Sequence, residues 1–101
     1  MREASIEHGL RLKLERLGCM FPKFTSPGNN GMPDRLCILP SGEIIFVEMK
    51  TTRGNLRPEQ RVQIRRLRDH NVRTVVIYGK QDADNFVRKV EYWGHKRRGR
   101  R

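Results

Sequence analysis

Two short apolar runs separated by a turn sequence constrain the fold of this chain more than any other feature. The runs Leu36–Leu39 and Ile44–Val47 flank Pro40-Ser41-Gly42, where proline fixes φ and glycine tolerates a left-handed backbone. This pattern predicts a β-hairpin. Folding the chain about Ser41 sets position 36 opposite 46 and position 38 opposite 44.

The predicted hairpin brings charged side chains together at its open end. Asp34 and Glu48 become cross-strand neighbours with Cβ atoms about 5 Å apart, and Lys50 follows on the same face because strand residues alternate. Carboxylates are ligands that Mg²⁺ prefers, and the backbone carbonyl of Met49 can add another oxygen. Glu-x-Lys on a strand is often a merely solvated face, but the matching register favours a metal-dependent nuclease centre. Lys50 is expected to position a water or to stabilise charge on the phosphate, and whether it is the general base stays open.

The charge of the chain indicates the kind of partner. Its 101 residues carry 22 Lys and Arg against 11 Asp and Glu, a net charge of +11, which favours nucleic acid. A membrane partner is not expected, because no predicted helix pairs a basic face with a broad apolar one. No apolar run approaches the roughly 20 residues of a membrane span and no signal peptide is visible, so a cytoplasmic location is expected. Cys19 and Cys37 are read as buried free thiols.

The first helix is predicted over residues 3–17, with Gly18 as its stop. Its apolar stripe is formed by Ile6, Leu10, Leu14 and Leu17. Glu3 falls within this stripe and Glu7 at its edge. An inward acid is costly unless it is paired, which makes both candidates for the site, although Glu3 is near enough to the terminus to be simply solvated.

The rest of the chain alternates between strands and helices. Cys19–Phe24 is predicted as an edge strand interrupted by Pro22, and residues 25–32 as a loop. A helix is expected from Pro58 to about residue 70, with Asn71 as its cap. A strand over Val72–Tyr78 and a last helix ending near residue 93 follow. The predicted fold is α/β, a small mixed sheet flanked by helices, in a single domain of residues 1–93 with a basic tail over residues 94–101.

Gln60 is a polar residue on the otherwise core-directed face of the second predicted helix. It is expected to orient Lys50 or a water. Basic residues expected to contact nucleic acid are Lys23, Arg35, Arg53, Arg57, Arg61, Arg65, Lys96, Arg97 and Arg98. For the tail itself, a disordered solubilising end and a phosphate-gripping arm are both open.

Several of these segments resemble the PD-(D/E)XK nuclease superfamily, and most closely its virus-type replication-repair nuclease (VRR-NUC) family. The resemblance covers nearly the whole chain and includes GMPDR, FVEMK and the Gln-bearing helix. It implies a restriction-endonuclease-like αβββαβ(α) core, with Asp34, Glu48 and a helix-one acid binding Mg²⁺ or Mn²⁺. It further implies a catalytic pair of Lys50 with Gln60, and leaves open whether Glu3 or Glu7 is the helix acid. Stand-alone members are typically phage or bacterial proteins.

The resemblance also implies a homodimer acting on branched DNA, such as four-way (Holliday) junctions, with no small-molecule cofactor. Three rivals remain at this point. The first is a catalytically inactive nucleic-acid-binding module of the same fold, and the second is a less structure-selective nicking nuclease. The third is a ribonuclease, although no aromatic-rich surface favours single-stranded RNA.

Overall fold

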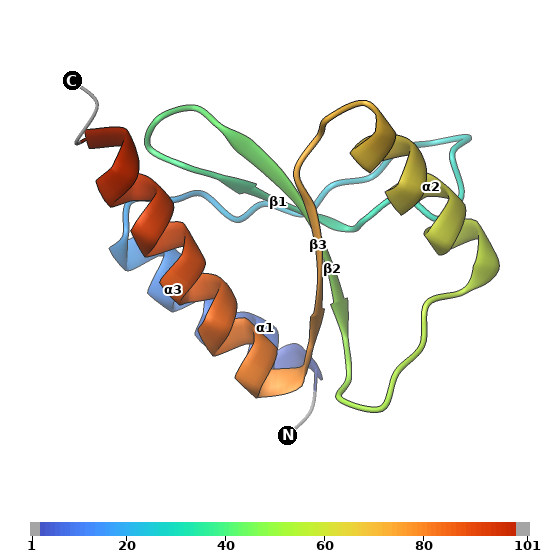
Figure 1. The fold of residues 1–101 in the computed structure, drawn as a ribbon. Helices are drawn as coiled ribbons and strands as arrows, with labels where there is room; N and C mark the ends of the chain where they lie inside the picture. The colour runs from blue at the N-terminus through green and yellow to red at the C-terminus, as the bar shows by residue number, and fades with distance from the viewer. Residues whose placement is uncertain (1–2, 99–101) are drawn as a thin grey trace.

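The computed structural model describes residues 3–98, except for the side chains of residues 95–98. Within that range three helices and three strands follow one another in the order α1 (Glu3–Arg16), β1 (Arg35–Ile38), β2 (Ile44–Lys50), α2 (Pro58–Asp69), β3 (Thr74–Tyr78) and α3 (Gly79–Arg98) (Figure 1). The described strands form one sheet with β2 in the middle, antiparallel to β1 and parallel to β3. The predicted α/β class with a small mixed sheet is therefore confirmed.

The predicted hairpin is present in the predicted register. Leu36 lies opposite Phe46 and Ile38 opposite Ile44. Gly42 takes a φ of 90° in the turn, a conformation that glycine adopts without steric cost. Its N–H donates to the carbonyl of Leu39, so the turn is closed by a backbone hydrogen bond.

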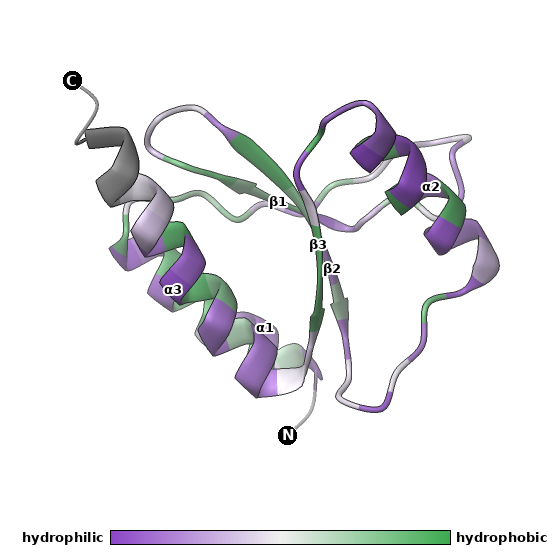
Figure 2. Cartoon of the chain, viewed as in Figure 1, coloured by the Kyte–Doolittle hydropathy of each residue, from purple (hydrophilic) through white to green (hydrophobic). Residues whose placement is uncertain are grey.

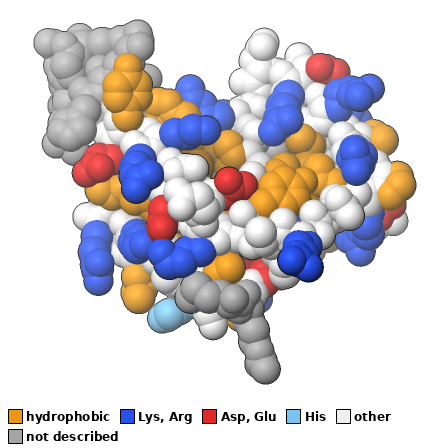
Figure 3. Space-filling view, turned by 60° about the horizontal axis from the view of Figure 1, so that its bottom comes forward, with side chains coloured by type: hydrophobic (Ala, Val, Ile, Leu, Met, Phe, Trp, Pro, Cys, Tyr) orange, Lys and Arg blue, Asp and Glu red, His pale blue; other side chains and the backbone are white. Residues whose placement is uncertain are grey.

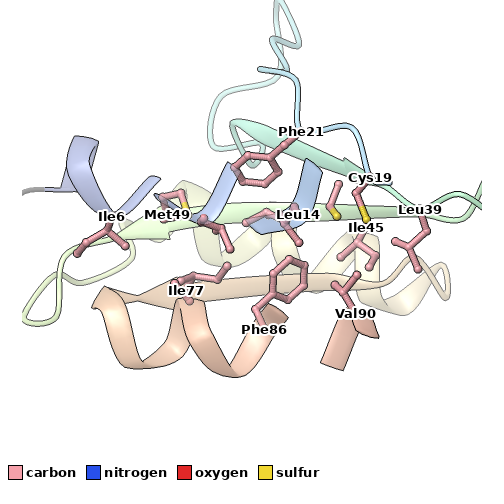
Figure 4. Packing of buried hydrophobic residues seen from close by; sticks show 14 residues of the cluster. Ile6, Leu14, Cys19, Phe21, Leu39, Ile45, Met49, Ile77, Phe86 and Val90 are labelled. Carbon is pink, nitrogen blue, oxygen red and sulfur yellow. The ribbon is translucent and has the colours of Figure 1, made fainter. Parts of the chain in front are cut away.

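Alternation along β2 divides the sheet into two faces. Ile45, Val47 and Met49 are buried on the face covered by α1 and α3. There they meet helix side chains such as Leu14 and Phe86 (Figure 4). Apolar segments of α1, α3 and the strands face one another, whereas α2 is largely hydrophilic (Figure 2). The hydrophobic core therefore lies on the α1/α3 side.

The opposite face of the sheet is covered by α2 and by the loop that precedes β1 (Figure 1). Gln60 and Ile64 are the buried residues of α2. The ring of Phe24 packs edge-on against that of Phe46, with centroids 5.4 Å apart. Glu48 and Lys50 alternate with the core residues of β2 and so point to this face, where the candidate site lies.

One predicted element is wrong. Cys19–Phe24 is not a strand but makes two isolated bridges to β1, Met20 to Ile38 and Lys23 to Arg35. Between the bridges, the carbonyl of Pro22 accepts the N–H of Leu36. Proline has no N–H to donate in return, so a continuous ladder cannot form.

Other boundaries differ by a few residues. α2 ends at Asp69, and Asn71 has the left-handed φ of 63° that suits a helix terminus. The expected end of the last helix near residue 93 is wrong, because α3 continues to Arg98. The first five residues of the predicted tail are thus helical, and residues 99–101 lie outside the described part. No helix within residues 3–98 has both the length and the apolar character to cross a membrane.

Candidate active site

Asp34 lies one residue before β1, at the open end of the hairpin. Because Arg35 pairs with Val47, the same register brings Asp34 beside Glu48. Partial burial raises the pKa of the Asp34 carboxyl, while hydrogen bonds from its own backbone and that of Met49, and the nearby charges of Lys50 and Lys23, act in the opposite direction. The predicted pairing of two carboxylates is therefore present.

Glu48 is the one acid among the described residues whose side chain is buried. Only 5% of its surface is exposed, in the middle strand of the sheet. Burial is the main reason that its pKa rises to about 7, and the charge of Asp34 raises it further. The Nζ of Lys50 lies 3.8 Å from Glu48 Oε2 and lowers the pKa only in part. The protein's own groups therefore do not fully compensate the charge of the ionised form of Glu48.

Gln60 connects Glu48 to the start of α2. Its Nε2 donates to Glu48 Oε2 at 3.2 Å, and its Oε1 accepts the backbone N–H of Arg57 at 2.9 Å. A carboxylate can only accept and an N–H can only donate, so these two partners fix the orientation of the amide. The side chain expected to orient Lys50 or a water is instead hydrogen-bonded to Glu48.

The donor set suits a hard divalent cation. Two carboxylates share a small volume, and each disfavours the ionisation of the other until a cation neutralises them. Among the described side chains, those of residues 3–94, no three of His, Cys, Asp or Glu gather closely enough to hold an ion. Mg²⁺ commonly binds through one or two carboxylates and completes its shell with water and substrate oxygens. Asp34 and Glu48 therefore fit as ligands, and the Met49 carbonyl stays a prediction.

Gly31 holds the loop before Asp34 against the start of α2. Its φ is 90°, and a Cβ at this position would overlap the backbone of Glu59 and Gln60. One turn further along the helix, Gln63 Nε2 donates to the carbonyl of Asn30 at 3.2 Å. Gly31 was not singled out from the sequence, because only the tertiary structure brings residue 31 next to residue 60.

The two acids of α1 have different environments. Glu7 Oε1 accepts a hydrogen bond from Arg35 Nη2. This pair lies on the core side of the sheet, away from Glu48, because Arg35 and Asp34 are consecutive and point to opposite faces. Glu3 is exposed, and its charge contributes to the raised pKa of Glu48. Of the two helix acids, Glu3 is therefore the one whose charge affects the site. It does not form a three-acid cluster with Asp34 and Glu48.

One predicted nucleic-acid contact is wrong. Arg35 is only 4% exposed, and its guanidinium also donates to the carbonyl of Phe21 at 3.3 Å and lies over the ring of the same residue. Burial lowers its pKa. A phosphate cannot reach this side chain, which joins α1 to the sheet.

The other described basic candidates are at the surface. Lys23 and Arg57 are close enough to the acids to affect them electrostatically. The charge of Lys23 lowers the pKa of Asp34, and that of Arg57 lowers the pKa of Glu48. The remaining exposed members are Arg53, Arg61 and Arg65. Lys and Arg side chains are spread over both halves of the face seen in Figure 3, with a few acids among them. The side chains of Lys96, Arg97 and Arg98 lie outside the described residues.

A mixed sheet with two carboxylates and a lysine on one face of its hairpin is the arrangement expected of the PD-(D/E)XK class of proteins. Within that class, the VRR-NUC domain model matches residues 16–81, so the chain belongs to the VRR-NUC family. It is 43% identical over 95 residues to "Putative nuclease p44" of Acyrthosiphon pisum secondary endosymbiont phage 1, covering 89% of this chain and 96% of that protein.

A solved structure of a VRR-NUC domain gives the same result for the fold. It matches with a TM-score of 0.79 and 29% sequence identity, over 85% of this chain and 94% of that chain. The family and the named phage relative together support a nuclease.

Proposed function

We propose that this chain is a Mg²⁺- or Mn²⁺-dependent DNA endonuclease that hydrolyses phosphodiester bonds at the site formed by Asp34, Glu48 and Lys50. The observation that carries the proposal is that Glu48 is buried beside Asp34 and has a pKa raised to about 7. A buried carboxylate beside a second carboxylate is costly for stability, and a site of this kind is typical of functional residues. Membership of the VRR-NUC family supports the same reaction class.

A divalent cation, when bound, would neutralise charge on the scissile phosphate and lower the pKa of a water. The protein's own residues hold the ligands in place. Gln60 fixes Glu48 through its amide, and the Met49 backbone holds Asp34. Lys50 keeps a positive charge 3.8 Å from Glu48, in a position to stabilise the negative charge that develops on phosphate oxygens. Gln60 acts here as a positioning residue.

The proposed substrate is branched DNA such as four-way junctions, cut by a homodimer. Net charge supports a nucleic-acid substrate, since +11 on 101 residues favours binding to the phosphate backbone. One chain offers a single small site, and a two-fold dimer would present two equivalent sites to the two strands that must be cut. The phage origin of the relative is consistent with action in the cytoplasm of a bacterial or phage-infected cell.

A substrate panel tests this proposal. Linear duplex, nicked duplex, flap, four-way junction and an RNA duplex of matched length are incubated with Mg²⁺, Mn²⁺ or a chelator. We expect metal-dependent, symmetrically paired cuts confined to the junction. Equal cutting of plain duplex would contradict junction selectivity and support a nicking nuclease. Binding of DNA without cleavage under every metal condition would support the inactive module.

The role of the basic C-terminal segment is tested on the same substrates. Truncation after Gly94 removes residues 95–101, five of which are Lys or Arg. If these residues contact phosphates, DNA affinity falls and the dependence of log K on log salt becomes less steep. An unchanged salt slope would show that the segment takes no part in binding.

A further inference from the structure

A second concave site lies on the same side of the sheet, between α2 and the loop before β1, which run side by side in Figure 1. Its volume is about 240 Å³. The loop contributes Ser26, Asn29 and Met32 to its lining. The second half of α2 and the residue after it contribute Gln63, Arg66, Leu67 and His70. The catalytic proposal uses none of these residues.

The loop wall of this pocket is held in shape by its own hydrogen bonds. Asn29 Nδ2 donates to Ser26 Oγ at 2.9 Å, and the Asn29 backbone N–H donates to the Ser26 carbonyl at 3.1 Å. Gln63 ties the neighbouring Asn30 carbonyl to α2. A wall fixed in this way needs little ordering when a ligand binds, which favours affinity.

The helix wall brings positive charge and polar groups to the pocket. Arg66 uses one of its N–H donors on Gln63 Oε1 at 3.4 Å, and a guanidinium has five donors. His70 Nδ1 lies 2.6 Å from the Arg66 carbonyl. A carbonyl only accepts, so Nδ1 carries the hydrogen and Nε2 is the second polar atom of the ring. Both side chains are exposed.

The pocket also has two apolar lining residues. Met32 and Leu67 are both half-buried and line the same pocket. A phosphate alone gains nothing from such a surface. A flat base gains from contact with methionine and leucine side chains, while amide and hydroxyl groups like those of Asn29 and Ser26 can hydrogen-bond its edge.

The pocket is close to the catalytic residues. Along α2, Gln63 is about 4.5 Å and Arg66 about 9 Å from Gln60, at 1.5 Å per residue. One DNA strand carries a phosphate for about every 3.4 Å of helix axis. For a strand that runs along α2, this spacing corresponds to about two to three nucleotides between a phosphate at Arg66 and one near Gln60. Gly31 packs on Gln60 only two residues after Asn29, so the loop links the two places directly.

We infer that this pocket binds one unpaired nucleotide of the substrate strand, two to three nucleotides from the cut. Its base lies on Met32 and Leu67, and its phosphate contacts Arg66. This inference rests on the proposed function for its substrate and adds a physical reason for preferring branched DNA, since a flap carries unpaired nucleotides and base pairs at a branch point open more easily than those inside a duplex. A fully paired strand cannot enter the pocket without breaking a base pair, which costs a few kcal/mol.

Binding to labelled DNA in a chelator, where no cleavage occurs, tests the pocket separately from catalysis. The substrates are a duplex with a three-nucleotide flap, a fully paired duplex of the same length, and the flap with abasic sugars in place of its bases. We expect wild type to bind the flap about tenfold more tightly than either of the others, which is at the lower end of what one base contributes by stacking on an aromatic ring, since Met32 and Leu67 are not aromatic. The variants Asn29→Ala and Arg66→Gln, singly and together, should bring the ratio towards one.

Arg16→Gln is the matched charge control, since Arg16 is exposed on α1, which covers the other face of the sheet. It should leave the flap-to-duplex ratio unchanged, whereas Arg66→Gln should also reduce the salt slope by about one. Equal ratios for wild type and the Asn29/Arg66 variants would overturn the inference. Tight binding of the abasic flap would overturn the base contact. Failure to cleave any DNA with Mg²⁺ would instead overturn the proposed function, while the binding ratios would still decide the pocket.

Discussion

The two faces of the sheet each bury one polar pair, and the pairs are very different. On the α1/α3 face, Arg35 and Glu7 are opposite charges that neutralise each other. On the α2 face, Glu48 is hydrogen-bonded to the neutral amide of Gln60 and lies beside a second acid. In the described chain no buried side-chain nitrogen or oxygen lacks a hydrogen-bond partner, so the difference between the pairs is one of charge.

We interpret the first pair as structural and the second as part of the proposed catalytic site. A neutralised buried pair is costly to break but attracts nothing further. Gln60 keeps Glu48 in place, and with Asp34 beside it the positive charge of Lys50 at 3.8 Å does not balance both acids, so a metal ion can supply the remaining charge. Asp34 and Arg35 are consecutive and point to opposite faces of the sheet. Asp34 therefore lies beside Glu48, whereas Arg35 pairs with Glu7. Four predictions test this difference between the two faces.

The largest effect is expected on the α2 face. Asp34→Asn and Glu48→Gln should each reduce the cleavage rate by about 10⁴-fold, because each removes a proposed metal ligand. The isosteric amide at position 48 can still accept from Gln60, so folding should be retained. Single-turnover cleavage assays and thermal unfolding of the same samples measure both effects. Cleavage at the wild-type rate in either variant would show that the residue is not a ligand.

On the α1/α3 face the expected effect is on stability. Arg35→Met should lower the free energy of unfolding by about 4 kcal/mol, because it leaves Glu7 beneath α1 without its partner. Arg35→Met combined with Glu7→Leu should recover most of this loss. Denaturant unfolding gives both values. If the double variant were no more stable than the single one, the pairing of Arg35 with Glu7 would not be the source of the loss.

The raised pKa of Glu48 predicts a pH dependence of stability in the metal-free protein. Its pKa is about 7 in the folded chain, against 4.5 for an ordinary glutamic acid. Between these values the unfolded chain releases the proton first, so stability falls as pH rises from 4.5 and the loss is complete above about pH 7. A shift of this size corresponds to about 3 kcal/mol at most.

Glu48→Gln is the control for this titration, because it has no proton to lose. Its stability should stay level over the same pH range, and at pH 8 the metal-free variant should be more stable than wild type. Added Mg²⁺ should remove the difference by stabilising wild type alone. Parallel pH profiles for the two proteins would contradict the assignment of the titration to Glu48.

The smallest effect concerns the loop that supports the α2 face. Gly31→Ala should cost about 2 kcal/mol and slow cleavage, because its Cβ would push on the backbone of Glu59 and Gln60. Gly28→Ala is the matched control, since Gly28 also has a positive φ of 81° but has open space around its Cβ position. It should lose about 1 kcal/mol from backbone strain and retain its activity. Equal activity losses would point to loop strain in place of the contact with α2.

Much of the architecture was predictable because it depends on local pattern. Alternation and the Pro40-Ser41-Gly42 turn were sufficient for the hairpin and its register, and hence for the pairing of Asp34 with Glu48. Helical periodicity gave α1 and α2 within one or two residues. The predicted strand at residues 19–24 failed because a short extended segment becomes a strand only if its partner can return its hydrogen bonds, and Pro22 prevents this.

Residue types and spacing determined that this chain has a two-acid, one-lysine hairpin in a basic α/β protein of the VRR-NUC family. They did not determine which charges are neutralised. Glu7 and Arg35, far apart in sequence, both looked suited to the site or its substrate, and only the packing of α1 on the sheet pairs them away from it. Gln60 likewise has its role only through its distance to Glu48. Burial and the partners of a charge are properties of the whole fold, which is why the tertiary structure alone could distinguish the structural ion pair from the proposed catalytic site.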